Sequence, residues 1–331
     1  MKIDNGVFRP LLIWLLFSAL FAAALDSHAA SDSGKQTVSV LYAGSLGTVM
    51  EHGVGPAFTQ ATGITYQGEA QGSVACAQLI RGHLRTPDVF ISADPLVNKA
   101  YLMGPANGDL VKWYILIASS QIVLAYNPNS KHTKEFEEVA AGKMPWYELI
   151  EKPGVRFGRG DPTIDPKGYR TLFVFHLAAN YYHRPELNTI LGEPQNPAQV
   201  FPEIVLMARV EAGQFDAGFF YRHEAAARNL PYITLPAEIN LGDPKFAAEY
   251  AKQSYTNAQG VTVHGAPILF TVTIPAGAQH PEKAVAFAKF LLTSRDLLHQ
   301  YGFGDVAHQL GGNSSQAPPQ LRSLADGAFK P

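Results

Sequence analysis

The sequence has almost no cysteine, since Cys76 is the only one in 331 residues. A single cysteine excludes an intrachain disulfide framework and any zinc or iron–sulfur site that is built from several cysteines. Free cysteine behaves as a small apolar residue, so we expect Cys76 to be a buried, unreactive thiol. Stability must then come from apolar packing, and the 47% of residues that are hydrophobic supply enough for a large core or for two cores of ordinary size.

Charge is also scarce, at 16% of residues with a formal net charge of −2. No Lys/Arg-rich run or basic stripe occurs, so the sequence predicts no nucleic-acid partner. The motifs GxSxG and HExxH are absent, and His176 and His223 have no catalytic partner at a recognisable spacing. A binding protein is therefore favoured over an enzyme. A secreted hydrolase stays the alternative, and ester or phosphatase assays would test it.

The first thirty residues have the layout of a cleavable signal peptide. Lys2 and Arg9 precede an apolar run over 11–25, and small residues follow it up to Ala30. The run is shorter than the ~20 residues that a membrane-spanning helix needs. Cleavage after Ala29 is expected, with cleavage after Ala24 or an uncleaved anchor as alternatives. The interpretation of 1–30 as a signal peptide predicts a secreted, periplasmic protein.

From residue 37 onward, short runs rich in β-branched residues alternate with helical patterns. This alternation predicts an α/β fold with parallel sheets, and two successive halves of similar rhythm predict two lobes with a cleft between them. From about 311 the polar tail is expected to be an extended strap or disordered. The expected strands are 37–42, 64–69, 87–93, 120–127, 155–158, 217–220 and 267–274. The expected helices are 47–62, 74–81, 169–182, 204–212 and 281–293.

Two serines follow expected strands directly, each beside a glycine and before a helix. They are Ser45 and Ser73. In parallel α/β sheets the carboxyl ends of the strands are the favoured ligand site, and helix N-termini there offer free N–H groups. Two such turns would cradle an anion without any charged residue. The alternative is that both serines are ordinary helix N-caps.

Several stretches of this chain resemble a known family. The stretches are YAGSL at 42–46, PDVFISAD at 87–94, FGRGDPTIDPKGYR at 157–170, VEAGQFDAGFFYR at 210–222 and LPAEINLGDPKFAAEY at 235–250. Across 38–303 the chain is similar to the molybdate/tungstate-binding proteins of ABC importers, nearest to the WtpA/ModA-like tungstate/molybdate group. The last stretch is the longest and the most specific.

The resemblance implies a two-lobed periplasmic binding protein of type II. Each lobe would be a mainly parallel sheet flanked by helices, with the ligand in the cleft between the lobes. We expect 36–118 plus 276–331 to form lobe 1 and 119–275 to form lobe 2. The implied function is capture of tungstate or molybdate for an importer's membrane permease, without a cofactor. We expect a monomer because no interface motif is present.

The resemblance also assigns site residues, one at a time. Hydroxyl groups of Ser45, Ser73 and Tyr221 would bind the oxo groups of the anion. The backbone N–H of Lys167 would contact the anion as well. Asp165, in the DPxGY-like segment, and Glu203, eighteen residues before Tyr221, would reach the metal centre. The chain departs from the family where Phe220 replaces a frequent Glu and where Lys167 replaces a smaller residue.

The two carboxylates distinguish between anions on physical grounds. At about 4 Å and an effective dielectric of ~20, each carboxylate would repel a like charge by roughly 4 kcal/mol. Molybdenum(VI) and tungsten(VI) are Lewis acids that accept further oxygen ligands, so Asp165 and Glu203 could bind the metal and raise its coordination from four towards six. The alternative is that Glu203 caps a helix and Asp165 caps a turn around a four-coordinate anion. A site for another tetrahedral oxyanion, sulfate or phosphate, also stays open, as does the preference between tungstate and molybdate.

Overall fold

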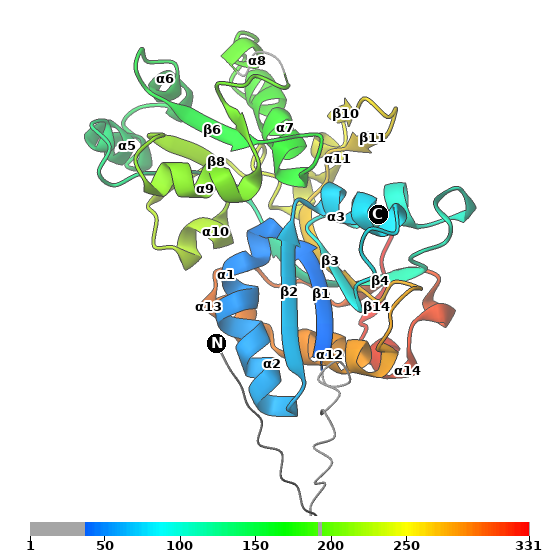
Figure 1. The fold of residues 1–331 in the computed structure, drawn as a ribbon. Coiled ribbons are helices and arrows are strands. Elements are labelled where there is room, and N and C mark those ends of the chain that lie inside the picture. Colours follow the sequence, from blue (N-terminus) through cyan, green and yellow to red (C-terminus); the bar gives the residue numbers. More distant parts are fainter. Residues whose placement is uncertain (1–36, 191–193, 331) are drawn as a thin grey trace, which may run out of the picture. The chain divides into compact units, whose positions relative to one another are not determined.

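Two β-sheets organise the computed structural model, which describes residues 37–190 and 194–330 (Figure 1). The signal peptide expected at 1–30 lies outside the described residues. Nowhere in the described ranges is there a helix with the length and apolarity needed to span a bilayer. Cys76 is a free, buried thiol, as expected, and burial raises its pKa.

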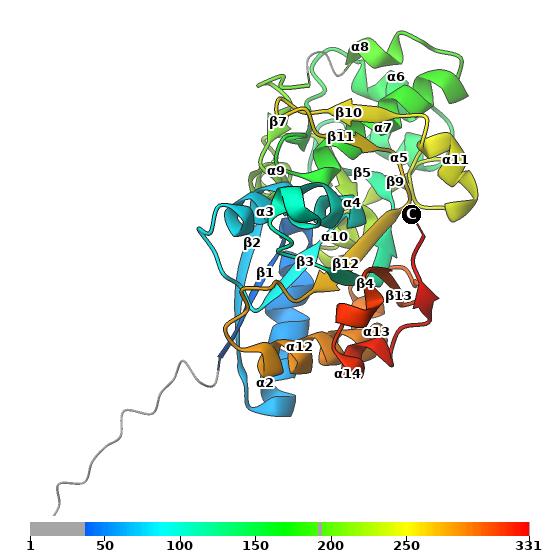
Figure 2. The same ribbon diagram turned by 90° about the vertical axis from the view of Figure 1, so that its right-hand side faces the viewer.

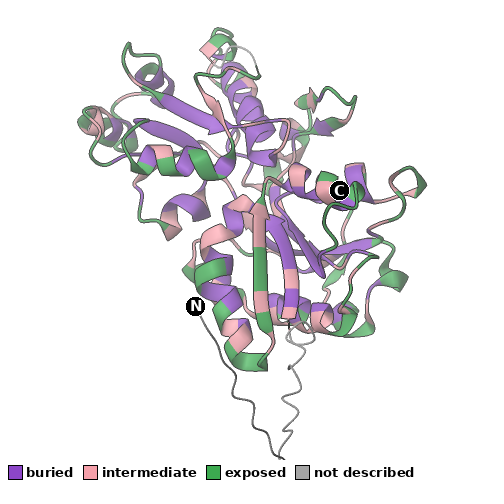
Figure 3. Ribbon diagram, viewed as in Figure 1, coloured by how far each residue is buried: buried purple, intermediate pink, exposed green. Residues whose placement is uncertain are grey.

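The first sheet has seven strands in the order β14-β13-β4-β12-β3-β1-β2. The pairing of β1 with β2 and with β3 is parallel, whereas β12 runs antiparallel to both β3 and β4. β2 is one edge of the sheet and is largely exposed (Figure 3). The strands are β1 (Thr37–Ala43), β2 (Thr65–Gln71), β3 (Val89–Ser92), β4 (Trp113–Ser120), β12 (Ile268–Thr273), β13 (Gln309–Gly312) and β14 (Gly327–Ala328).

Helices pack on this sheet through apolar faces with helical spacing. In α12 (Pro281–Thr293) the buried residues Ala284, Phe287, Ala288 and Leu291 recur every three or four positions, which is the pattern of a helix with one face in the core. Phe287 packs edge to face against Phe58, with ring centroids 5.0 Å apart. The other helices on this sheet include α1 (Gly47–Val49), α2 (Gly55–Thr62), α3 (Ser73–Arg81), α4 (Pro95–Val97), α13 (Arg295–Gln300) and α14 (Pro319–Arg322).

The second sheet has five strands in the order β7-β6-β8-β5-β9. β6 pairs in parallel with β7 and β8, and β5 runs antiparallel to β8 and β9. The strands are β5 (Ile122–Tyr126), β6 (Phe157–Gly160), β7 (Val200–Phe201), β8 (Ala217–Tyr221) and β9 (Tyr232–Thr234). The helices are α5 (Thr133–Ala140), α6 (Trp146–Ile150), α7 (Pro166–Tyr181), α8 (Leu187–Ile190), α9 (Glu203–Glu211) and α10 (Arg222–Ala227).

Helix α7 is the central helix of this second layer. It is buried over nearly its whole length, including the charged residues Lys167 and Arg170 in its first turns. Its Phe175 packs with Phe219 of β8, with ring centroids 5.1 Å apart. A buried helix can carry charged residues only if they find partners, so these two positions mark a polar cluster inside the protein.

The chain crosses between the two sheets along neighbouring strands. β4 leads directly into β5 through Gln121, and the chain returns through a small hairpin, β10 (Ser254–Thr256) with β11 (Thr262–His264), to β12 (Figure 2). Helix α11 (Ala247–Tyr250) lies in the same segment. Strands that enter a sheet from the opposite direction pair antiparallel, so both sheets are mixed. The expected parallel pairing is found around β1 and β6 and between β13 and β14.

Strand pairing in the first sheet includes β12 and the C-terminal tail. The expected lobe boundaries stay a prediction, although β12 lies inside 119–275 and pairs within the first sheet. The tail from about 311, expected as an extended strap or disordered, is ordered, because β13 pairs with β4 and β14 pairs with β13. Strand β13 could not be predicted from the sequence, because two of its four residues are glycines and the segment has no alternating hydrophobic pattern.

Candidate functional site

The two predicted serines lie where β1 and β2 end and their helices begin. Ser45 belongs to a tight 3₁₀ turn, Gly44–Leu46, and its buried Oγ has no hydrogen-bond partner among the described residues. Ser73 is the first residue of α3, and its Oγ accepts a 3.0 Å hydrogen bond from the backbone N–H of Ala93. The N-cap residues of these turns are Ala43 and Gly72, so neither serine is the N-cap that the alternative required.

Asp165 caps α7 with one carboxylate oxygen and leaves the other free. Its Oδ1 accepts from the backbone N–H of Lys167 at 2.9 Å. Its Oδ2 is buried, and the described part of the chain offers it no partner. Burial raises the pKa of Asp165 to about 6, against the opposing effect of the Lys167 charge. The Lys167 N–H, which we expected at the anion, is therefore engaged by Asp165.

Glu203 is similarly divided between a structural contact and an unused oxygen. It is the first residue of α9 and follows the N-cap Pro202, so it does not cap the helix by itself. Its Oε1 accepts from Nζ of Lys167 at 2.8 Å, whereas its Oε2 is buried without a partner in 37–190 and 194–330. Burial, reinforced by the nearby Asp165, raises the pKa of Glu203 to about 8.

The Lys167 side chain holds this end of the second lobe together. Its fully buried Nζ also donates to both oxygens of Glu224, at 2.8 and 3.0 Å. Glu224 in turn accepts from the backbone N–H of Tyr221 at 2.9 Å and completes a capping box at the start of α10. Burial opposes the Lys167 charge, but Glu203 and Glu224 outweigh it and raise the pKa of the lysine. One ammonium thus faces three carboxylates, those of Asp165, Glu203 and Glu224.

Tyr221 ends β8 and is fully buried. Its hydroxyl accepts from Nη1 of Arg170 at 2.8 Å. Arg170 also donates to the carbonyl of Ala93 at 2.7 Å and pairs with Oδ2 of Asp94 at 3.0 Å. Sequence reasoning assigned no role to Arg170 or Asp94, although both lie in stretches that carry the resemblance.

His223 is a third residue that spacing alone did not reveal. Its Nε2 lies 3.1 Å from the carbonyl oxygen of Ser45, and its Nδ1 lies 3.0 Å from Oγ of Ser120. A carbonyl only accepts, so Nε2 carries the hydrogen and Nδ1 accepts from the serine. Burial lowers the pKa of His223 to about 3, which keeps the ring neutral.

The structure brings these residues together across the two sheets. A β-carbon at position 44 would lie 2.7 Å from Oε2 of Glu203, and one at position 72 would lie 2.2 Å from the carbonyl oxygen of Ile164. At position 72 the close atom belongs to the backbone, so only glycine fits there, whereas at position 44 it is the end of the Glu203 side chain. The N–H of Ala75 donates to that same Ile164 oxygen at 3.3 Å. The turns that carry Ser45 and Ser73 therefore touch the segments that carry Glu203 and Asp165. Lys167 and Tyr221 join them through the contacts above.

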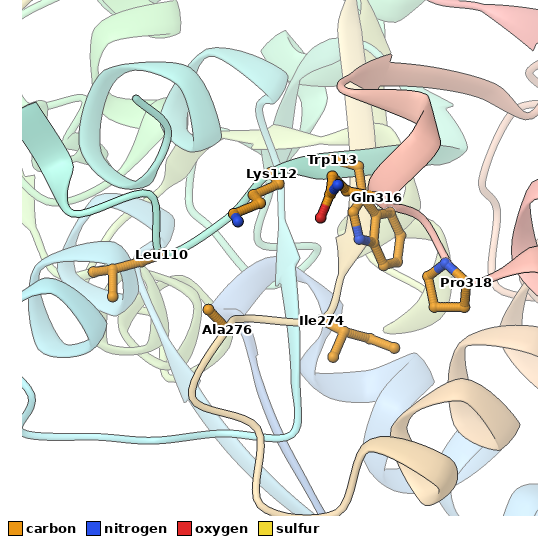
Figure 4. A pocket seen from close by; sticks show the side chains of 7 residues that line it. All are labelled: Leu110, Lys112, Trp113, Ile274, Ala276, Gln316 and Pro318. Carbon is orange, nitrogen blue, oxygen red and sulfur yellow. The ribbon is translucent and has the colours of Figure 1, made fainter. Parts of the chain in front are cut away.

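A pocket of about 200 Å³ adjoins this cluster and includes Ser45, Glu203, Glu224 and Arg228 in its lining. A pocket of about 260 Å³ lies elsewhere, beside Trp113, Ile274 and Pro318, and contains none of the predicted site residues (Figure 4). Within the described residues no group of three or more His, Cys, Asp or Glu side chains is arranged to hold a metal ion.

Comparison with known proteins gives a consistent picture. The model of the bacterial extracellular solute-binding protein family matches residues 38–304. A Haloferax volcanii protein that is named as a molybdenum-binding protein of an ABC transporter is 37% identical over 270 residues, which cover 81% of each chain.

Solved structures support the fold. The periplasmic molybdate-binding protein of Azotobacter vinelandii matches with a TM-score of 0.57 at 15% identity, over 81% of this chain and 99% of that one. A sulfate-binding protein of Mycobacterium tuberculosis matches with a TM-score of 0.50 at 13% identity, over 81% and 86%. Likeness at this level of identity concerns the fold alone, and it confirms the predicted two-lobed α/β fold.

Proposed function

Because this chain belongs to the bacterial extracellular solute-binding proteins, we propose that it captures molybdate or tungstate and delivers the anion to the membrane permease of an ABC importer. Membership confirms the prediction of a solute-binding protein rather than an enzyme. The identity of the ligand is proposed from the residues of the site.

The proposal rests on three oxygen atoms without a hydrogen-bond partner, which lie where the segments of the two sheets come into contact. Within the described ranges, Ser45 Oγ, Asp165 Oδ2 and Glu203 Oε2 are buried and lack a hydrogen-bond partner. A buried polar atom without a partner costs about 1–3 kcal/mol, so three in one place are retained for a ligand. The hydroxyls of Ser73 and Tyr221 each accept a bond and keep a hydrogen for that ligand.

The charges narrow the class of anion. Glu203 and Glu224 share the one ammonium of Lys167, and Asp165 lies close to it, so the acidic groups outnumber this cation and a dianion held only by hydrogen bonds would meet net negative charge. At about 4 Å and an effective dielectric of ~20, each uncompensated carboxylate costs roughly 4 kcal/mol. We propose that Asp165 Oδ2 and Glu203 Oε2 instead bond the molybdenum or tungsten centre. Sulfur in sulfate accepts no such ligands, so the same carboxylates would exclude it.

Other features agree with this function. The Haloferax volcanii relative is named for binding molybdenum. The family name implies a location outside the cytoplasm, which fits the signal peptide proposed for residues 1–30. We propose that the protein acts as a monomer without a cofactor, with lobe 1 formed by 36–118 plus 276–331 and lobe 2 by 119–275.

Calorimetric titration of the anion-stripped mature protein tests the function. Tungstate, molybdate, sulfate and phosphate are added in turn. Submicromolar binding of the first two with no heat from the others is expected. Comparable binding of sulfate or phosphate would keep an oxyanion carrier but refute the role of the carboxylates. Silence from all four would refute the proposed ligand.

A further inference from the structure

Arg170 is a fully buried guanidinium that contacts both lobes of the protein. It lies in α7, beside the second sheet, and it is 2% exposed. Its Nη1 donates to the carbonyl of Ala93 at 2.7 Å, and its Nη2 lies 3.0 Å from Asp94 Oδ2. Ala93 and Asp94 directly follow β3 of the first sheet. Part of this buried cation is therefore satisfied only while the two lobes are in contact.

The contact of Arg170 with Tyr221 fixes the direction of a hydrogen bond. A guanidinium is a donor only, so the Tyr221 hydroxyl must accept in their 2.8 Å bond. A phenol has one hydrogen, and that hydrogen remains for a second partner. Among the described residues no acceptor takes it. Tyr221 is thereby prepared to donate to an oxygen in the site.

Ser73 is prepared in the same way from the first lobe. The backbone N–H of Ala93 donates to its Oγ at 3.0 Å, which leaves the serine hydrogen free to donate. The peptide groups of Ala93 thus act on both hydroxyls. The N–H orients Ser73 directly, and the carbonyl holds Arg170, which orients Tyr221.

We propose that Arg170 is a positioning residue that makes Tyr221 a donor to the bound anion and couples that orientation to contact between the lobes. The inference rests on the proposed function, since the acceptor is an oxo group of the anion. The Nη groups of Arg170 are already engaged by Ala93, Tyr221 and Asp94. Its effect passes through Tyr221, so the two residues act as one unit.

The test uses the full mature protein labelled with ¹³C at the ζ carbon of tyrosine. The Tyr221 resonance is identified by its absence from the Tyr221→Phe variant. In the anion-free protein, Arg170→Lys and Arg170→Met are expected to shift this resonance, because the donor at its oxygen is changed or lost. Tyr169→Phe is the matched control. It removes another hydrogen bond to Asp94 Oδ2, which is 2.7 Å long in the intact protein, but leaves the Arg170–Tyr221 contact in place.

Molybdate affinity supplies the second readout. Arg170→Met and Tyr221→Phe are each expected to weaken binding about tenfold or more, as for loss of a hydrogen bond to a charged group. The double variant should be no weaker than the weaker single variant, and Arg170→Lys should recover part of the loss. If Arg170→Met does not fold, Arg170→Lys carries the spectral test.

The outcomes separate this inference from the proposed function. An unmoved Tyr221 resonance in folded Arg170 variants, or losses that multiply in the double variant, would overturn the role of Arg170. An equal shift in Tyr169→Phe would overturn it as well. If the intact protein responds to none of molybdate, tungstate, sulfate or phosphate, the proposed function fails and the donor role fails with it. A shifted resonance together with anion binding that stays intact in the Arg170 variants would refute the inference alone.

Discussion

The two lobes contribute different kinds of group to the site. The first lobe supplies neutral hydroxyls, Ser45 and Ser73, on turns that follow β1 and β2. The second lobe supplies one hydroxyl, that of Tyr221, and the charged groups around Lys167, from α7, α9 and α10. Neutral donors at strand ends suit any tetrahedral oxyanion, whereas carboxylates repel an anion unless its central atom accepts them as ligands. The difference suggests that the first lobe provides general anion affinity and the second provides selectivity.

The largest loss of stability is expected on substitution of Lys167, whose ammonium group pairs with two buried carboxylates of the second lobe. Lys167→Met leaves Glu203 and Glu224 buried without a cation, and breaking such a pair typically costs about 3–5 kcal/mol. Urea unfolding would measure the loss of free energy of unfolding. Lys252→Met is the control, since that lysine pairs with Glu249 at the surface and should cost less than about 1 kcal/mol. Equal effects of the two changes would show that Lys167 does not organise the site.

The carboxylates should control selectivity. Asp165→Asn and Glu203→Gln are expected to weaken molybdate and tungstate binding by about 2–5 kcal/mol, the range for losing one member of a buried charged contact. Sulfate binding should be unchanged or tighter, because repulsion is relieved. Competition calorimetry measures both, with Glu211→Gln at the other end of α9 as control. Parallel losses for all three anions would contradict the division between the lobes.

The first lobe should show the opposite behaviour. Ser45→Ala and Ser73→Ala remove donors that do not distinguish one oxo group from another. Each change should weaken binding by about 1.5–3 kcal/mol, the range for hydrogen bonds to charged groups. Affinity should fall by a similar factor for every anion that binds. The same titrations measure this. A change in the ratio of molybdate to sulfate affinity would contradict it.

His223, which contacts Ser45 of the first lobe, should make the free energy of unfolding depend on pH. Burial, with the nearby Lys167 and Arg222 charges, lowers its pKa to about 3, below the ordinary value of 6.5. The unfolded chain binds the His223 proton more readily than the folded protein does. The contribution of His223 to the free energy of unfolding is therefore complete above pH 6.5 and is lost as the pH falls, by about 1 kcal/mol over the first pH unit. Asp165 and Glu203, whose pKa values are raised, act in the opposite direction over this range, so the loss is measured by comparing urea unfolding of the intact protein and of His223→Gln at pH 7.5 and 5.5. The change in stability on going to pH 5.5 should be less unfavourable in the variant by about 1 kcal/mol, and the same change in both proteins would show that another group titrates.

Local pattern was sufficient for much of the fold and for the serines. A strand, a glycine and a helix are neighbours in sequence, so the places of Ser45 and Ser73 could be predicted from their turns. Alternation of strands and helices likewise located α3, α9 and α12 within a few residues. The antiparallel crossings could not be predicted, because the direction in which β12 enters the first sheet depends on where the intervening chain folds.

The charged half was less predictable, because its contacts join distant segments. Lys167 was assigned a backbone contact, yet its N–H caps with Asp165 and its side chain binds Glu203 and Glu224. Arg170 and Asp94 meet only when the sheets are together. A charged residue in a sequence indicates the need for a partner, but tertiary packing selects it. The one local signal that was available, Glu224 three residues after Tyr221, marks a capping box.

Asp165 and Glu203 are proposed to bond the metal of the anion. X-ray absorption of the protein loaded with one equivalent of tungstate tests this coordination, because it counts the oxygen atoms around tungsten. More than four oxygen neighbours are expected, with the additional ones lost in the Asp165→Asn/Glu203→Gln double variant. Four equivalent short tungsten–oxygen bonds, the same in both proteins, would contradict the account and leave an anion held by hydrogen bonds alone.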